Sequence, residues 1–279
     1  AIIKFGLMEG KNFYEGNPTG TDFTRASMNW NVVCNGGLSV GALAIADRHP
    51  GISFFTVASA LRGLEYMLPE FAPDGAWEEG LGYWEYTIQY LSYFSEAMRT
   101  ALGTDFNILN YRGISQTALF ALKSNGNTGA NRFHDDGGTT VSIPSQLFWL
   151  GKRFENPGVT SAKLRYEADF GSGTSAFTDL LWYDTAVQPD TIDLPLDGTI
   201  GKVEVGSMRS SWTDYSGMFL SFHGGTNMVN HSHLDTGSFV MEMLGERWAV
   251  DLGSDNYNLD GYFYTNGPRW NYYRTRAEG

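Results

Sequence analysis

The sequence predicts a multidomain α+β protein in which a helical part is followed by antiparallel β-strands. In several segments between residues 29 and 183, apolar side chains recur every three or four positions, which is the period of a helix that buries one face. Beyond Pro189 the pattern changes to an alternation of apolar and polar residues, which is typical of strands. We therefore place the domain boundary near residue 188, with a helical domain in residues 1–188 and the start of a β domain in residues 189–279.

The helical part follows an N-terminal stretch, residues 1–26, that lacks clear periodicity. The first helix is expected over residues 29–49, where small and apolar side chains recur at helical spacing until Pro50 interrupts them. Further helices are expected over residues 52–68, 83–102, 115–123, 145–154 and 161–183. Repeated helices of this length, joined by loops with polar and aromatic residues, favour a helical toroid or solenoid over an α/β alternation.

The β part is expected to contain strands within residues 200–212, 216–225, 238–244 and 247–252. The last two strands should form a hairpin with Gly245 and Glu246 as a two-residue turn. This turn pairs Leu244 with Arg247 and places Asp251 near the end of the return strand. Hairpin geometry alone does not bring Asp251 to the histidines that precede the hairpin.

The composition limits the size of the core and the classes of partner that the chain can bind. With 279 residues, 42% of them hydrophobic, the chain can bury one large core or two moderate ones. The net charge of −12 argues against nucleic acid and against an anionic membrane surface as partners. No apolar run approaches the roughly twenty residues that span a membrane. The single cysteine, Cys34, excludes an internal disulfide, and the 8 Trp and 15 Tyr suit either a carbohydrate groove or a large core.

The strongest chemical signal lies in residues 222–257, which hold three of the five histidines, His223, His231 and His233. Imidazole is a common metal ligand and transfers protons near neutral pH. In an extended backbone the rings of His231 and His233 point to the same side and can serve one site. The polar run 230–235 directly precedes an apolar strand, where a β scaffold usually places a site, although a polar loop without any ligand gives the same pattern.

The strings NHSHLDTGSF, AVDLG and RTRAEG resemble the heparinase II/III-like polysaccharide lyases, a family that includes heparinases and alginate lyases. The resemblance covers residues 29–279 and is strongest over residues 230–251. It implies an α/α toroid followed by an antiparallel β-sandwich, and cleavage of an acidic, uronate-containing polysaccharide by β-elimination. We expect a fragment of a periplasmic or secreted bacterial protein, with any export signal removed or lying upstream.

The resemblance implies roles for three residues of the histidine segment. His231, the first His of the His-x-His pair, lies at the catalytic centre in the family pattern. His233 and Asp251 match two ligands of a structural zinc, and a further His, expected just beyond Gly279, completes the set.

In the helical part, the family pattern has a Tyr after an acidic, Gly-containing loop as proton donor or base. Tyr83 fits that position best, with Tyr86 one helical turn further on. The residues alone leave two other interpretations open. The acidic groups can favour the helix dipole while the aromatic rings fill the core. Alternatively, a pair among Asp74, Glu78 and Glu79 can serve a glycoside hydrolase.

The family pattern also has an Asn at the start of an earlier helix, and Asn31 is the closest match. An amide N–H there would help neutralise the uronate carboxylate in the lyase reaction. Asn31 could instead be the N-cap of the helix that follows, and His134 could be only a surface group. The side chains that we expect to contact substrate are Trp30, Trp77, Glu78, Tyr86 and His134. A carbohydrate-binding module without catalysis remains a third possibility for the chain.

Overall fold

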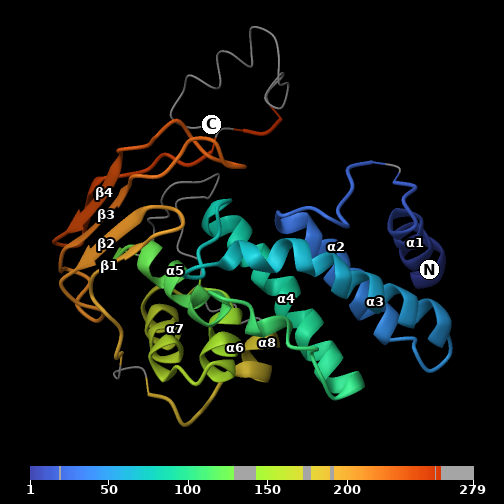
Figure 1. The fold of residues 1–279 in the computed structure, drawn as a ribbon. Helices are drawn as coiled ribbons and strands as arrows, with labels where there is room; N and C mark the ends of the chain where they lie inside the picture. Colours follow the sequence, from blue (N-terminus) through green and yellow to red (C-terminus); the bar gives the residue numbers. More distant parts are fainter. Residues whose placement is uncertain (19, 129–142, 172–176, 189–191, 255, 259–279) are drawn as a thin grey trace, which may run out of the picture. The chain divides into compact units, whose positions relative to one another are not determined.

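The computed structural model describes residues 1–18, 20–128, 143–171, 177–188, 192–254 and 256–258 (Figure 1). By its internal contacts the chain divides into two compact units. One comprises residues 1–72 and 85–114, and the other comprises residues 73–84 and 115–279. Within the described ranges, no helix combines the length and the apolar character that a membrane crossing requires.

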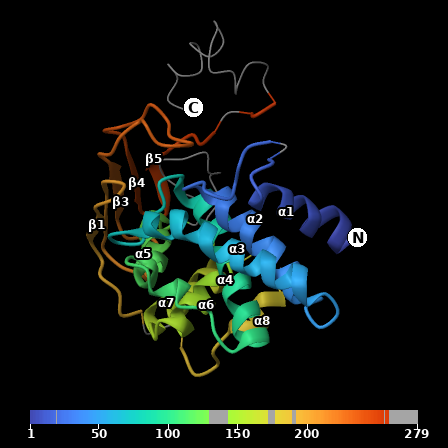
Figure 2. The same ribbon diagram turned by 45° about the vertical axis from the view of Figure 1, so that its right-hand side comes forward.

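The first unit is helical. Its elements are the π-helix η1 (Ile2–Leu7), α1 (Met8–Tyr14), α2 (Asn29–Leu43), α3 (Pro50–Met67), the 3-10 helices η2 (Leu68–Phe71) and η3 (Ile108–Asn110), and most of α4 (Gly80–Leu102). Helices α2 and α3 lie side by side in Figures 1 and 2. Gly36 of α2 lies against α4, where an added Cβ would come within 3.0 Å of the Tyr90 carbonyl oxygen. This close approach requires a residue without a side chain.

The helices of the first unit differ from the sequence analysis at three points. Residues 2–14 are helical although the sequence shows no periodicity there. The helix expected to reach residue 49 ends at Leu43, and α3 begins at Pro50, which suits a first helical position because its missing N–H would be unpaired there anyway. Since α2 begins at Asn29, Asn31 lies inside the first turn and is not the N-cap.

The second unit contains η4 (Ile114–Gln116) at its boundary, the helices α5 (Thr117–Ser124), α6 (Gln146–Arg153), α7 (Pro157–Phe170) and α8 (Phe177–Trp182), and a sheet. The single helix expected over residues 161–183 is therefore two helices. Helix α7 ends because the backbone of Gly171 turns to an extended conformation, with ψ at 138°.

The sheet is an antiparallel meander in which each strand pairs with the next one along the chain (Figure 1). Its strands are β1 (Gly198–Ile200), β2 (Val205–Arg209), β3 (Phe219–His223), β4 (Phe239–Met243) and β5 (Glu246–Ala249). In β3 the buried side chains alternate, with Phe219, Ser221 and His223 on the inner face. The period of two brings His223 to the interior at the end of the strand.

The hairpin between β4 and β5 turns one residue earlier than the sequence suggests. Leu244 and Gly245 both have positive φ, 58° and 76°, as a tight two-residue turn with type I′ character requires. Met243 therefore pairs with Glu246, and the expected pairing of Leu244 with Arg247 is wrong. A bulge between Met241 and Glu242 then shifts the register further along β5.

The order of helices first and antiparallel strands afterwards is confirmed, since the last described helix ends at Trp182 and the first strand begins at Gly198. The compact units do not follow that order, because α5 to α8 belong to the same unit as the sheet. The closed α/α toroid, the second sheet of a β-sandwich and a domain boundary near residue 188 stay predictions.

Candidate functional site

Two residues that the sequence singles out separately, Tyr83 and His231, lie together in the second unit. Tyr83 comes from the first turn of α4, and His231 comes from the loop between β3 and β4. Their rings are stacked, with centroids 3.9 Å apart and planes inclined by 20°. The phenol and the imidazole therefore form one polar aromatic surface.

A third ring connects the polar atoms of this pair. The hydroxyl oxygens of Tyr83 and Tyr257 lie 3.1 Å apart. The Tyr257 hydroxyl also lies 3.4 Å from Nδ1 of His231. Because a tyrosine hydroxyl can both donate and accept, Tyr257 can bridge the Tyr83 hydroxyl and the imidazole.

A buried carboxylate, that of Glu79, lies beside the other nitrogen of the imidazole. Its Oε1 is 4.0 Å from Nε2 of His231 and accepts a hydrogen bond of 2.6 Å from Nδ2 of Asn230. Its Oε2 accepts a hydrogen bond of 3.0 Å from the indole N–H of Trp77. Only 3% of Glu79 is exposed, so these contacts fix its position relative to His231.

The segment that carries Glu79 and Tyr83 is held at two points. Near its start, Asp74 accepts backbone hydrogen bonds from Gly201, at 2.6 Å, and from Lys202, at 3.3 Å, in the turn after β1. Further on, Thr117 at the start of α5 donates its hydroxyl to the Gly75 carbonyl, at 2.6 Å. The same hydroxyl accepts the indole N–H of Trp84 at 2.8 Å.

The β3–β4 loop that carries His231 is fixed at its base. Nδ1 of His223 lies 3.5 Å from the carboxylate of Asp235, and both side chains are buried. The backbone N–H of Gly237 donates to the His223 carbonyl at 2.7 Å, in a turn where Gly237 has a φ of +92°. His231 itself has a φ of +60°, a conformation that a residue with a Cβ adopts at a cost of roughly 1–2 kcal/mol. Such strain tends to occur where the surrounding contacts impose a functional geometry.

The predicted zinc ligands are His233, which is buried, and Asp251, which is partly exposed. The Asp251 carboxylate accepts a backbone hydrogen bond of 2.8 Å from Gly253 and borders a hollow of about 620 Å³ next to the β4–β5 turn. Among the described residues, no three or more His, Cys, Asp and Glu side chains are grouped so that they could hold a metal ion. A structural zinc needs four ligands, so these residues do not by themselves form a site, and zinc binding stays a prediction.

The predicted catalytic residue Asn31 belongs to the first unit. Asn31 is fully buried in the first unit, where its Nδ2 donates to the carbonyls of Ala26, at 2.7 Å, and Gly63, at 2.9 Å. Its Oδ1 accepts from the amide of Asn35 at 2.8 Å. Because both amide hydrogens and the oxygen are used, this placement favours a structural role for Asn31.

The predicted substrate contacts differ in their exposure. Trp30 and Tyr86, both in the first unit, are 45% and 41% exposed, so their rings can meet a ligand. Trp77 is 2% exposed and packs in the core, where it supports Glu79. Glu78 is partly exposed and lies 3.8 Å from the ammonium of Lys202. His134 lies outside the described residues.

The three carboxylates considered for a glycoside hydrolase each contact a different partner. Asp74 fixes the turn after β1, Glu78 pairs with Lys202, and Glu79 faces His231. Hydrolysis by paired carboxylates requires two groups that face one scissile bond. The contacts of these side chains therefore do not favour that interpretation.

Sequence reasoning missed Tyr257 and Asn230 as members of the cluster. Tyr257 lies in a stretch rich in Asp and Asn whose oxygen donors fall at the wrong spacing for a calcium loop, and a tyrosine there has no distinctive local signal. Asn230 precedes His231 directly and could have been included as the first residue of the polar run.

No protein-family model matches the chain, and no curated protein sequence matches it. Solved structures do match. One is a mutant of the heparan sulfate lyase HepC from Pedobacter heparinus, with a TM-score of 0.60 and 16% identity, covering 95% of this chain. Another is a heparinase III with methylated lysines, with a TM-score of 0.53 and 17% identity, covering 85% of this chain. The chain spans only 37% and 34% of the lengths of these two proteins. It therefore has the fold of heparinase-like polysaccharide lyases over that span.

Proposed function

We propose that this chain belongs to a polysaccharide lyase that cleaves a uronate-containing polysaccharide by β-elimination. The observation that carries the proposal is the stacking of Tyr83 on His231, with Tyr257 bridging their polar atoms. The heparinase-like fold supports the choice of lyase chemistry. The substrate would be heparin-like, heparan sulfate-like or alginate-like, and the protein would act in the periplasm or outside the cell.

The reaction requires a base for the proton on C5 of the uronate and an acid for the oxygen on C4. In the proposed mechanism the imidazole of His231 removes the C5 proton, and the electrons of that C–H bond form the C4=C5 double bond. The bond between C4 and its oxygen breaks, and the Tyr83 hydroxyl protonates the departing oxygen. The stacked arrangement places the base and the acid side by side on one surface.

After this step His231 holds one additional proton and Tyr83 lacks one. Tyr257 provides a path between them, since its hydroxyl is 3.4 Å from Nδ1 of His231 and 3.1 Å from the Tyr83 oxygen. A shift of one proton along this path restores both groups. The proton removed from C5 is thus balanced by the proton delivered to the leaving oxygen, and no further reactant is needed.

Glu79 acts in this scheme as a positioning residue. Its carboxylate, held by Trp77 and Asn230, faces Nε2 of His231 at 4.0 Å and limits rotation of the imidazole. Asn31 takes no step, because both hydrogens of its amide are donated within the first unit. No step passes through zinc, which would only brace the loop that carries His231 through His233 and Asp251.

The test compares Tyr83→Phe with Tyr183→Phe in an assay for the ultraviolet absorbance of the C4=C5 product. Tyr183 is a matched control, since it is 42% exposed in the same unit and lies against Phe148. Loss of a general acid should lower the rate about 10²–10⁴-fold for Tyr83→Phe, with Tyr183→Phe close to the parent protein. Near-full activity of Tyr83→Phe would remove Tyr83 from the mechanism, and a comparable loss in Tyr86→Phe alone would transfer the role to Tyr86.

A further inference from the structure

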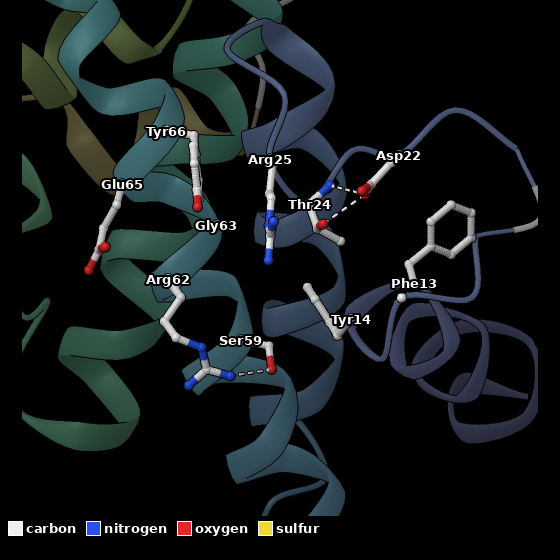
Figure 3. Close-up of a pocket in the computed structure, with 11 residues that line it drawn as sticks. Phe13, Tyr14, Asp22, Thr24, Arg25, Ser59, Arg62, Gly63, Glu65 and Tyr66 are labelled. Atoms are coloured by element: carbon white, nitrogen blue, oxygen red, sulfur yellow. Dashed lines mark hydrogen bonds between the residues drawn. The ribbon is translucent and has the colours of Figure 1, made fainter.

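The first unit contains a polar cavity of about 380 Å³ that plays no part in the mechanism above (Figure 3). Its lining comes from the end of α1, the connection from α1 to α2, and one face of α3. A volume of this size falls within the range of small-ligand pockets and accommodates a single sugar ring. The side chains around it combine two arginines and two carboxylates with aromatic rings.

Arg25 and Arg62 are the two cationic side chains of this cavity, and both are exposed. Nη2 of Arg62 donates to Oγ of Ser59 at 3.0 Å, and the guanidinium of Arg25 lies 6.0 Å from the ring centre of Tyr66. Within the part of the chain that the structure describes, neither arginine forms an ion pair. Each guanidinium has five N–H donors, so both have donors left for an oxyanion.

Two acidic residues, Asp22 and Glu65, also line the cavity, but they are placed differently. The Oδ1 atom of Asp22 accepts two hydrogen bonds from Thr24, from its backbone N–H at 2.8 Å and from its hydroxyl at 2.7 Å. In Figure 3 the carboxylate of Glu65 points away from Arg25, which itself points into the space next to Tyr14. Among the described residues, neither carboxylate pairs with Arg25 or Arg62, so the guanidinium donors stay available to a ligand.

The walls of the cavity are held in place before any ligand binds. The hydroxyl of Tyr14 donates to Oδ1 of Asn35 at 2.7 Å. Gly63 lies so close to its neighbours that an added Cβ would be 2.7 Å from the Asn35 amide nitrogen and 2.8 Å from the Thr24 carbonyl oxygen. Tyr66 is 49% exposed and offers a ring face to a ligand in the cavity.

We propose that this cavity is a binding site for an anionic sugar unit, in which Arg25 and Arg62 bind a carboxylate or sulfate group and Tyr66 contacts the sugar ring. The choice of a sugar rests on the proposed function, whereas the preference for an oxyanion follows from the two arginines. Such a site would give a polyuronate two guanidinium contacts on a protein whose net charge of −12 repels it.

The test measures binding by calorimetry with three oligosaccharides of equal length: an unsulfated glucuronate oligosaccharide, its sulfated counterpart and a neutral cello-oligosaccharide. Tyr83→Phe serves as the background, so that no probe is cleaved. The single substitutions Arg25→Gln and Arg62→Gln should each weaken binding of the anionic probe about tenfold or more. Arg48→Gln removes the same charge from an exposed side chain elsewhere in the first unit and should change binding less than about twofold.

Binding of the unsulfated probe would identify the carboxylate as the bound group, and binding of the sulfated probe alone would identify the sulfate. The proposal is overturned if the neutral probe binds equally well, if no probe binds, or if Arg25→Gln and Arg62→Gln behave like Arg48→Gln. Arg25→Lys keeps the charge and the fold but loses the planar fork, and it should lie between the parent protein and Arg25→Gln. If the arginine variants weaken binding as predicted while the parent protein forms no unsaturated product, the binding site is supported and the proposed lyase function is contradicted.

Discussion

Thr117 is the buried link between α5 and the segment that carries Glu79 and Tyr83. Its side chain is 0% exposed, and its hydroxyl serves as both acceptor and donor, for the Trp84 indole N–H and for the Gly75 carbonyl. Thr117→Val keeps the shape of the side chain and removes both hydrogen bonds. A buried polar group left without a partner costs about 1–3 kcal/mol, so two such groups should lower the free energy of unfolding by about 3 kcal/mol.

Thr117→Ser is the matched control, because it keeps the hydroxyl and removes only a methyl group. This loss should cost about 1 kcal/mol. With an m value of about 3 kcal/mol/M, Thr117→Val should move the urea midpoint down by about 1 M, and Thr117→Ser by about a third of that. Equal midpoints for the two variants would refute the assignment of a structural role to these hydrogen bonds. If the proposed lyase function holds, Thr117→Val should also reduce formation of the unsaturated product more than Thr117→Ser, since it loosens the segment that carries Tyr83.

Two further predictions concern stability. Gly126→Ala should lower the free energy of unfolding by about 1–3 kcal/mol, because its Cβ would collide with the carboxylate of Glu242, which is buried and bonded to backbone N–H groups of the same loop. Gly51→Ala, with open space around its Cβ, is the control and should be neutral or slightly stabilising in the same denaturation experiment. Burial raises the pKa of Tyr14, so above about pH 10 the unfolded chain loses this proton while the folded protein retains it, and stability falls as pH rises. Tyr14→Phe should give a shallower alkaline loss of stability, and an unchanged slope would contradict this linkage.

The period of apolar residues located most helices and the regions of β2 to β5, because an element that buries one face repeats its apolar residues at the period of that element. Strand β1 lies almost entirely before the expected region, which begins at residue 200. The N-terminal helices could not be predicted in this way, since α1 buries only Gly10 and its sequence therefore has no apolar repeat. The register of the β4–β5 hairpin could not be predicted either, because Gly245 fits a tight turn as its first or its second central residue. Only the structure places Gly245 second, after Leu244.

At the candidate site, the rings of Tyr83 and His231 are stacked, whereas Asn31 lies in the first unit with its amide fully hydrogen-bonded. An asparagine that binds substrate and one that bridges buried backbone carbonyls have the same side chain, and the sequence around Asn31 fits both. Tyr257 could not be found because its position in the cluster depends on how the chain folds back after β5. The catalytic roles of all these residues stay predictions.

β-Elimination is tested most directly by counting two products of the same digestion. The full-length protein is incubated with sulfated and unsulfated uronate polysaccharides, with and without a chelator, and new reducing ends and ultraviolet absorbance are measured together. We predict one C4=C5 double bond for each new reducing end on at least one substrate, and a chelator-sensitive rate would support the predicted zinc. Reducing ends that appear without absorbance would indicate hydrolysis and contradict the account, as would the absence of both products with every substrate from a folded protein.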